Sequence, residues 1–198
     1  MSILIAVPAA GASRRMRGRD KLLEEIDGEP LLRRQARAAL ETGHPVLVLL
    51  PSDSPSRAAA LKGLDVSTCE VPDATTGMSA SLRIAAEQAE GHDALAILLP
   101  DVPGMACDDL CVVIDAYRAH RKAGEAPQIH RATDPEGRPG TPTIFPNRYF
   151  RRFAELTGDE GGRSVLSKEK VVFVAFPDDR ATLDLDTPED WAAYRHRR

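Results

Sequence analysis

Short apolar runs of strand length recur along the chain, and stretches with helical periodicity separate them. Most of these runs are continuously apolar, a pattern typical of strands that are covered on both faces in a parallel sheet. Right-handed crossovers between parallel strands build a doubly wound sheet. We therefore expect an α/β fold with a mostly parallel, doubly wound sheet and helices on both faces. The runs span residues 3–7, 46–50, 66–71, 94–99 and 171–176.

Proline, polar residues and glycine indicate where the helices begin and end. Four segments start with proline or a polar residue and stop at a glycine, which are the ordinary signals of helix start and stop. We expect these segments to form the helices between the strands. They span residues 30–43, 54–63, 79–91 and 108–124.

The pattern changes between residues 126 and 146. Two short strand-like pieces, residues 128–131 and 142–145, are separated by a run rich in proline and glycine. Such a run between apolar pieces predicts a hairpin or an insertion, which we expect to flank the ligand cleft.

Composition places the chain among ordinary globular proteins. It has 198 residues, of which 42% are hydrophobic and 28% charged, and this fits a single domain over residues 1–198. The formal net charge of −4 argues against a general affinity for nucleic acid or anionic membranes. The apolar stretches fall short of the roughly 20 residues that cross a bilayer. We therefore expect neither nucleic acid nor a membrane as a partner.

The start of the chain and its cysteines favour the cytoplasm. The first residues lack a basic segment and are too short for a secretory signal, so they are interpreted as a strand. Cys69, Cys107 and Cys111 are odd in number, which fits free thiols in a reducing compartment. Cys107 and Cys111 could share a helix face and bind a metal, although small buried cysteines are the commoner case.

The first apolar run leads directly into a loop, residues 8–21, in which small residues come first and cations follow. In an open parallel sheet, ligands bind beyond the carboxyl ends of the strands. Ala9, Ala10 and Gly11 would let backbone N–H groups approach a base or a triphosphate, and Ser13 adds a hydroxyl. We call residues 8–21 the first loop and expect it to bind a nucleotide.

Two cations of the first loop, Arg15 and Lys21, would neutralise phosphate charge. Arginine offers a planar fork to phosphate oxygens, whereas lysine supplies a mobile point charge. The loop matches neither the Walker A nor the dinucleotide-binding glycine pattern, which argues against a kinase or a dehydrogenase. The alternatives are an exposed loop with solvated arginines or a nucleic-acid patch, and the acidic remainder of the chain weakens the latter.

Carboxylates follow two other apolar segments. Asp101 comes just beyond the run 94–99, and Asp184 and Asp186 lie two residues apart in an extended piece. Alternation sends Asp184 and Asp186 to the same side. Mg²⁺ prefers hard oxygen ligands and usually takes one or two carboxylates with phosphate oxygens and water, so Asp101 and Asp186 are candidate ligands. The alternative for Asp186 is that it only precedes a helix that begins at Pro188.

Gly77, Ser79 and Ser81 open the helix expected near residue 79. Free N–H groups and hydroxyls at a helix start could bind a base or a phosphate. A plain serine cap explains the same residues equally well.

Four segments resemble, in order, the motifs of the nucleotidyltransferases that activate molybdopterin, and less closely the cytidylyltransferase of isoprenoid synthesis. The first loop resembles A-A-G-x-S-x-R-M-G-x-x-K, and residues 77–82 resemble G-M-x-x-S-L. Residues 100–103, Pro-Asp-Val-Pro, resemble G-D-x-P, and residues 184–190 resemble D-I-D-T-P-x-D. The resemblance implies a Rossmann-like fold of the nucleotide-diphospho-sugar transferase type.

The resemblance also implies roles for single residues. The small residues 9–11 would line the nucleotide, Arg15 and Lys21 would hold its phosphates, and Asp101 and Asp186 would coordinate Mg²⁺. Arg15, Lys21 and Asp101 would therefore be catalytic. Residues 77–81 would lie near the base.

Two later segments resemble the motifs that contact the second, phosphorylated substrate. Residues 137–142 resemble G-x-x-G-H-P, with Thr141 in place of the commoner histidine, and residues 156–163 resemble L-x-G-D-x-G-x-R. The implied acceptor-binding residues are Gly140, Thr141, Pro142, Asp159 and Arg163.

The sequence thus predicts a Mg²⁺-dependent transferase that joins CMP from CTP to molybdopterin and releases pyrophosphate. CTP is favoured because Ala10 resembles the cytidylyl members, whereas guanylyl members have a glycine there. Guanylyl, sugar-phosphate and methylerythritol-phosphate transferases are close alternatives. A different class of function is a non-catalytic nucleotide-binding protein that delivers a cofactor. A transient contact with a molybdoenzyme or its chaperone would fit either role.

Overall fold

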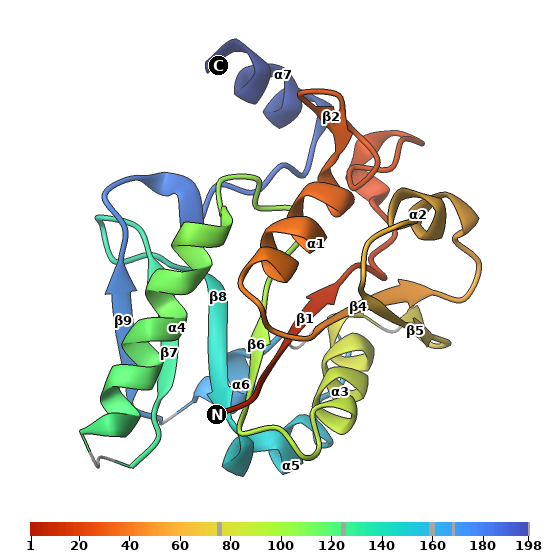
Figure 1. Ribbon diagram of the computed structural model, residues 1–198. Coiled ribbons are helices and arrows are strands. Elements are labelled where there is room, and N and C mark those ends of the chain that lie inside the picture. The colour runs from red at the N-terminus through yellow and green to blue at the C-terminus, as the bar shows by residue number, and fades with distance from the viewer. Residues whose placement is uncertain (75–76, 124–125, 159–160, 168, 198) are drawn as a thin grey trace.

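A seven-stranded sheet forms the centre of the molecule, and helices lie on both of its faces (Figure 1). The computed structural model describes residues 1–74, 77–123, 126–158, 161–167 and 169–197. The strands of this sheet are β1 (Ile3–Pro8), β4 (Val46–Pro51), β5 (Ser67–Val71), β6 (Ala94–Ile97), β7 (Ile129–Thr133), β8 (Pro139–Pro146) and β9 (Val171–Ala175).

The sheet order is β5-β4-β1-β6-β8-β7-β9, which places β6 at the centre and the first strand next to it, in the interior of the sheet. β1 is parallel to both of its neighbours, with Ile5 opposite Val46 and Ile3 opposite Ala94. β8 runs antiparallel to β6 and to β7, and β9 is parallel to β7. The mostly parallel, doubly wound sheet is confirmed. The predicted hairpin, β7 and β8, belongs to this sheet and does not form a separate insertion.

Seven α-helices and a short hairpin complete the described part of the chain. The hairpin consists of β2 (Glu25–Ile26) and β3 (Glu29–Pro30). No helix there is long and apolar enough to span a membrane. The helices are α1 (Leu31–Glu41), α2 (Pro55–Ala60), α3 (Met78–Gln88), α4 (Cys107–Lys122), α5 (Phe150–Phe153), α6 (Arg163–Leu166) and α7 (Pro188–Arg197).

The helices agree with the start and stop signals of the sequence to within a few residues. α1 ends just before Gly43, whose φ of 75° is a left-handed conformation that glycine adopts without strain. The predicted end of α4 at Gly124 lies outside the described residues. α7 begins at Pro188 as expected.

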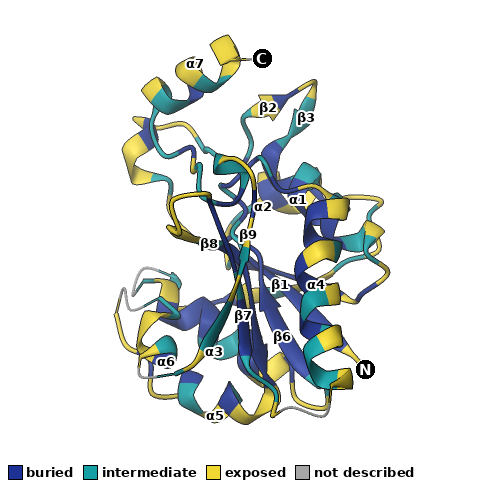
Figure 2. Ribbon diagram, turned by 90° about the vertical axis from the view of Figure 1, so that its left-hand side faces the viewer, coloured by how far each residue is buried: buried dark blue, intermediate teal, exposed yellow. Residues whose placement is uncertain are grey.

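Alternation along the strands divides the core into two layers. Ile3, Ile5 and Val7 of β1 pack on one face with α1 and α4, whereas Leu4 and Ala6 pack on the other face with α3. Burial of each isoleucine, leucine or valine side chain contributes roughly 1.5–3 kcal/mol. Figure 2 shows the central strands as buried, while β9 at the edge of the sheet is only partly buried.

The first loop leaves the centre of the sheet and folds back on itself. It contains a short 3₁₀ turn, Arg14–Met16, flanked by Ser13 and Arg17, which both have a positive φ. Such left-handed conformations cost roughly 1–2 kcal/mol in residues other than glycine. Met16 is fully buried and anchors the turn. Tertiary contacts must therefore hold the loop in this shape.

Candidate functional site

A cavity of about 440 Å³ opens beyond the carboxyl ends of β1 and β6. This is the position at which ligands bind in open parallel sheets. The first loop forms one wall, the start of α3 forms a second, and the segments after β6 and before α7 close the space. We call it the first cavity. Among its lining residues are Ala10, Gly11, Ser13, Arg15, Lys21, Gly77, Ser81, Asp101 and Asp186.

Charges from three distant segments meet at one end of the first cavity. The Nζ atom of Lys21 lies 2.6 Å from Oδ2 of Asp101 and 2.6 Å from Oδ1 of Asp186. A guanidinium nitrogen of Arg15 lies 2.6 Å from Oδ2 of Asp186. The structure thus brings together the four charged residues that the sequence predicted for phosphate and metal binding.

The protonation of this cluster follows from its mutual attraction. Burial lowers the pKa of Lys21, but the carboxylates of Asp101 and Asp186 outweigh burial and raise the pKa above its ordinary value. Burial raises the pKa of Asp186, but Lys21 and Arg15 lower it by more than burial raises it, so the pKa lies below its ordinary value. Lys21 and Asp186 are therefore both charged at neutral pH.

Asp101 has one oxygen that the described protein does not satisfy. Its Oδ1 atom is buried and accepts no hydrogen bond from any described residue, which is uncommon for a buried carboxylate oxygen. Asp184 lies close by, and its pKa is raised by burial and then by the charges of Asp186 and Asp101. Such a concentration of acidic oxygens favours a bound cation.

The donor set therefore fits a divalent cation in part. In the described residues no group of three or more histidine, cysteine or acidic side chains has the geometry of a complete metal site. Asp101 and Asp186 could supply two carboxylates, and this is the usual number for Mg²⁺ when substrate phosphates and water complete its shell.

Asp186 does not cap helix α7, because its neighbours Thr187 and Asp190 do so. Thr187 and Asp190 cap α7 reciprocally, because Asp190 accepts a hydrogen bond from the backbone N–H of Thr187 and the Thr187 hydroxyl accepts one from that of Asp190. The side chain of Asp186 is therefore left for Lys21 and Arg15.

Two of the predicted nucleotide-binding residues lie behind the cavity wall. Ala9 is fully buried, and its carbonyl oxygen accepts a 2.5 Å hydrogen bond from Arg57. Ser79 is also fully buried, its backbone N–H donates to Gly158 and its hydroxyl accepts from Arg83. Both residues shape the wall from the inside.

Gly11 faces open space. A Cβ atom added at this position would meet no atom of the described residues within 4 Å, apart from its chain neighbours. The glycine therefore leaves room on the cavity side of the first loop, where a ligand can approach the backbone closely.

A second cavity of about 460 Å³ adjoins the first and shares Leu99, Asp101 and Met78 with it. The predicted acceptor-binding residues Gly140, Thr141 and Arg163 line this second cavity. Pro142 follows Thr141 in β8 and is not among the lining residues, and Asp159 lies outside the described residues. Asp101 thus stands at the boundary between the two cavities.

Gly140 and Thr141 have clear local roles. A Cβ atom at Gly140 would lie 2.0 Å from the carbonyl oxygen of Ala181, so only glycine fits there. The Thr141 hydroxyl accepts a hydrogen bond from the backbone N–H of Leu99 and donates one to the carbonyl of Ile97. These contacts tie β8 to the end of β6, directly before Asp101.

The sequence did not single out Arg131, which also lines the second cavity. Its Nε atom donates to the carbonyl of Gly140 at 3.0 Å, and its pKa is lowered by burial and by the charge of Arg163. Among the described residues neither arginine forms an ion pair with a carboxylate. Alternation along the strand places Arg131 on the same face as the buried Ile129, and an arginine on a buried strand face is unusual enough to suggest a functional role.

Most of the chain matches a known protein family. Residues 5–172 match the model of the MobA-like NTP transferase domain. The chain belongs to this family. The match includes the first loop and Asp101, whereas Asp186 lies beyond it. The resemblance seen in the sequence motifs is confirmed at the level of the family.

Solved structures with the same fold include a mycobacterial protein and a nucleotidyl transferase. Rv0371c from Mycobacterium tuberculosis H37Rv has a TM-score of 0.80 and 25% identity, over 99% of this chain and 98% of that chain. Its complex with manganese has a TM-score of 0.76 and 24% identity, over 98% of this chain and 97% of that chain. A nucleotidyl transferase from Methanothermobacter thermautotroptrophicus has a TM-score of 0.81 and 18% identity, over 99% of this chain and 97% of that chain.

A more distant structure with the same fold is CMP:2-keto-3-deoxy-manno-octonic acid synthetase in complex with CTP. It has a TM-score of 0.71 and 14% identity, over 99% of this chain and 98% of that chain. A search of curated protein sequences finds no match. Together the family and the fold establish a nucleotidyltransferase of the MobA-like kind.

Proposed function

We propose that the protein transfers CMP from CTP to a phosphorylated acceptor of the molybdopterin type, with Mg²⁺ as cofactor and pyrophosphate as the second product. One observation carries the proposal: the cations of the first loop and the carboxylates Asp101 and Asp186 meet where the two cavities join. A nucleotide in the first cavity and an acceptor in the second would therefore meet at this cluster.

The reaction needs little proton transfer. A phosphate monoester of the acceptor is already anionic near neutral pH, so its oxygen can attack the α-phosphorus of the nucleotide directly. A new P–O bond forms, the bond to the β-phosphate breaks, and pyrophosphate leaves with the electron pair. Catalysis then depends on positioning and on stabilisation of negative charge.

The residues of the cluster divide this work. Arg15 and Lys21 bind the phosphates, and Lys21 holds a positive charge near the position of the leaving group. Asp101 and Asp186 would hold Mg²⁺, which supplies further charge neutralisation to the phosphates when it is bound. The manganese complex of the M. tuberculosis relative supports a divalent cation in this fold.

Lys21 and a metal would compete for the same carboxylates. Both Asp101 and Asp186 already have Lys21 as their counter-ion, at 2.6 Å. A triphosphate offers Lys21 other oxygen acceptors, so metal and nucleotide binding should support each other. The unsatisfied Oδ1 atom of Asp101 supports the same view.

The second cavity supports an acceptor with an anionic group and an apolar body. Arg131 and Arg163 supply positive charge, and Leu82, Ile97 and Phe145 supply apolar surface. The choice of CTP rests on Ala10 and is supported by the related synthetase that binds CTP.

The test is a panel of nucleotides and acceptors with the purified protein and MgCl₂. CTP, GTP, ATP and UTP are each offered with molybdopterin, a sugar phosphate and methylerythritol phosphate, and pyrophosphate release is measured. Fastest release with CTP and molybdopterin is expected. A preference for GTP would overturn the choice of CTP, and a preference for another acceptor would overturn molybdopterin.

The same panel tests the non-catalytic alternative. Nucleotide binding measured by calorimetry, without pyrophosphate from any acceptor, would favour a protein that delivers a cofactor to a molybdoenzyme or its chaperone. The position of Lys21, Asp101 and Asp186 where the two cavities join favours catalysis, because a carrier of one nucleotide needs no second cavity beside its phosphate site.

A further inference from the structure

One buried arginine contacts the first loop at three places. Arg57 lies in α2 and is only 5% exposed. Its guanidinium group donates to both carboxylate oxygens of Asp20, at 2.7 and 2.9 Å, and to the carbonyl oxygen of Ala9 at 2.5 Å. A longer contact of 3.4 Å reaches the hydroxyl of Ser13. The start, the middle and the end of the loop thus share one partner.

Asp20 links Arg57 to further groups in and next to the first loop. Its carboxylate also accepts hydrogen bonds from the Ser13 hydroxyl and from the backbone N–H of Leu22, both at 3.1 Å. Burial raises its pKa, but the hydrogen bond and the charge of Arg57 outweigh burial and keep the pKa below its ordinary value. Asp20 is therefore a charged partner of Arg57 at neutral pH.

The position of Asp20 in the sequence matters because Lys21 follows it directly. The side chain of Asp20 is held by α2, whereas the side chain of Lys21 contacts Asp101 and Asp186. A fixed Asp20 therefore restricts the backbone from which Lys21 extends.

The first loop has few backbone hydrogen bonds of its own. Met16 donates to Ser13 and Arg19 donates to Met16, and Ser13 and Arg17 adopt left-handed conformations. A loop of this length loses much conformational entropy when it is ordered. The bidentate contact between Arg57 and Asp20 opposes that loss, since its geometry allows one arrangement only.

We propose that Arg57 is a positioning residue for the nucleotide, which acts through Asp20 and Ala9 to hold the first loop in its binding conformation. The inference rests on the proposed function, because it assumes that the first loop binds an NTP. Arg57 is not among the residues that line the first cavity. It raises nucleotide affinity by keeping the competent conformation of the loop populated before the ligand arrives.

The first experiment measures the loop without any ligand. Backbone amide hydrogen exchange is followed in the wild type and in the R57K, R57Q and D20N variants. We expect faster exchange over residues 9–22 in R57Q and D20N, with an unchanged central sheet and a smaller change in R57K. R57K keeps the charge but loses the planar fork. Unchanged exchange over residues 9–22 in all three variants would overturn the proposal.

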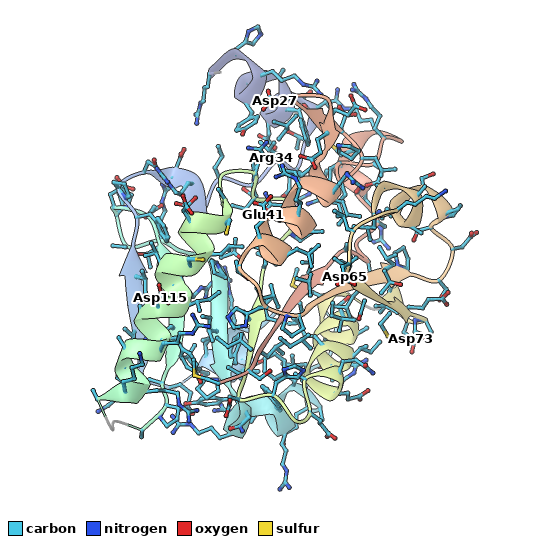
Figure 3. All side chains as sticks on the ribbon, in the orientation of Figure 1. Asp27, Arg34, Glu41, Asp65, Asp73 and Asp115 are labelled. Atoms are coloured by element: carbon cyan, nitrogen blue, oxygen red, sulfur yellow. The ribbon has the colours of Figure 1, made fainter. Side chains whose placement is uncertain are left out.

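Arg37 provides a matched control. Its guanidinium group contacts both carboxylate oxygens of Glu29, at 3.0 and 2.8 Å, so the bidentate arrangement is the same. It lies on α1, whose charged face carries the labelled Arg34 and Glu41 in Figure 3, and it lines neither cavity. R37Q should leave hydrogen exchange over residues 9–22 and nucleotide binding as in the wild type.

The second experiment measures nucleotide binding and turnover. If the competent loop falls to about a tenth of the population in R57Q, the apparent Kd for Mg·CTP rises about tenfold. The KM for the acceptor should stay unchanged, because residues outside the first loop line the second cavity. D20N should act in the same direction, and the R57Q/D20N double variant should bind no more weakly than R57Q alone, because both changes break one contact.

The two experiments separate this inference from the function on which it rests. One possible result is faster loop exchange in R57Q together with a wild type that binds no NTP. This result would show that Arg57 orders the first loop, but it would overturn both the proposed function and the role of Arg57 in nucleotide binding. Nucleotide affinity equal to that of the wild type in R57Q and D20N would overturn the positioning role and leave the transferase intact.

Discussion

The cationic side chains of the two cavities differ in their partners. In the first cavity, Lys21 and Arg15 are neutralised by Asp101 and Asp186 within the protein. In the second, Arg131 has backbone carbonyls as its hydrogen-bond partners and a second arginine as its charged neighbour.

In the first cavity the charged side chains already compensate one another before any ligand binds. In the second cavity neither Arg131 nor Arg163 has a carboxylate as an ion-pair partner among the described residues, although Asp101 and Asp184 also line this cavity. We infer that the first cavity supplies the chemistry common to the family, whereas the second sets the identity of the acceptor.

Asp101→Asn should have the largest effect, because Asp101 borders both cavities. The change keeps the size of the side chain but removes the charge that a divalent cation requires. We expect pyrophosphate release to fall by about 10³-fold, near the upper range for loss of one electrostatic stabiliser. Mn²⁺ binding, followed by electron paramagnetic resonance, should weaken in parallel. Wild-type turnover in the variant would remove the metal assignment.

Arg131→Gln should separate the two cavities. Loss of a charge-assisted hydrogen bond to an anionic acceptor costs about 1.5–3 kcal/mol, which corresponds to roughly a 10- to 150-fold rise in the acceptor KM. The Kd for CTP should stay as in the wild type. Steady-state kinetics with each substrate varied in turn checks this. Equal effects on both substrates would contradict the division of roles between the cavities.

Gly11→Ala should weaken nucleotide binding without loss of stability. An added methyl group meets no atom of the described residues within 4 Å, so it would take up space that the proposed nucleotide needs. Overpacking of this kind costs about 1–3 kcal/mol, and we expect a rise in the Kd for CTP near tenfold. Calorimetry gives the Kd, and the Tm should remain that of the wild type. Unchanged affinity would place the nucleotide elsewhere.

Asp20→Asn should have the smallest effect, and this effect should depend on pH. The folded-state pKa of Asp20 lies below its ordinary value of 3.8. Its contribution to stability is therefore fully present above pH 3.8 and is lost as the pH falls through the lowered pKa. The variant should be less stable by about 1–2 kcal/mol at pH 7. Urea unfolding should show this difference shrink below about pH 4; a constant difference would contradict the role of the charge.

Much of the first cavity could be predicted from the sequence because its residues lie in contiguous segments at strand ends. Asp101 follows a buried strand, and Lys21 closes the loop after the first strand. Parallel strands bring their carboxyl ends to one edge of the sheet, so these positions converge whatever the details of the helices. The same reasoning overlooked that Ala9 and Ser79 face inward, because the direction of a side chain in a loop depends on its exact backbone.

The second cavity was harder to predict. The segment between residues 126 and 146 reads as a hairpin, but its place inside the sheet depends on the pairing of β8 with β6. Arg131 faces a cavity only because that pairing turns one side of β7 toward α6 and the end of β8. No local pattern specifies which strand a hairpin joins.

The strands, the helices between them and the charged groups at the strand ends follow from the amino-acid sequence, because periodicity and turn residues act over a few positions. The contact of Arg57 with the first loop and the position of Arg131 at the second cavity could be seen only in the folded molecule. The partner of a buried charge depends on which elements pack together. Arg57 meets Ala9 across 48 positions of the sequence, and no local preference extends that far.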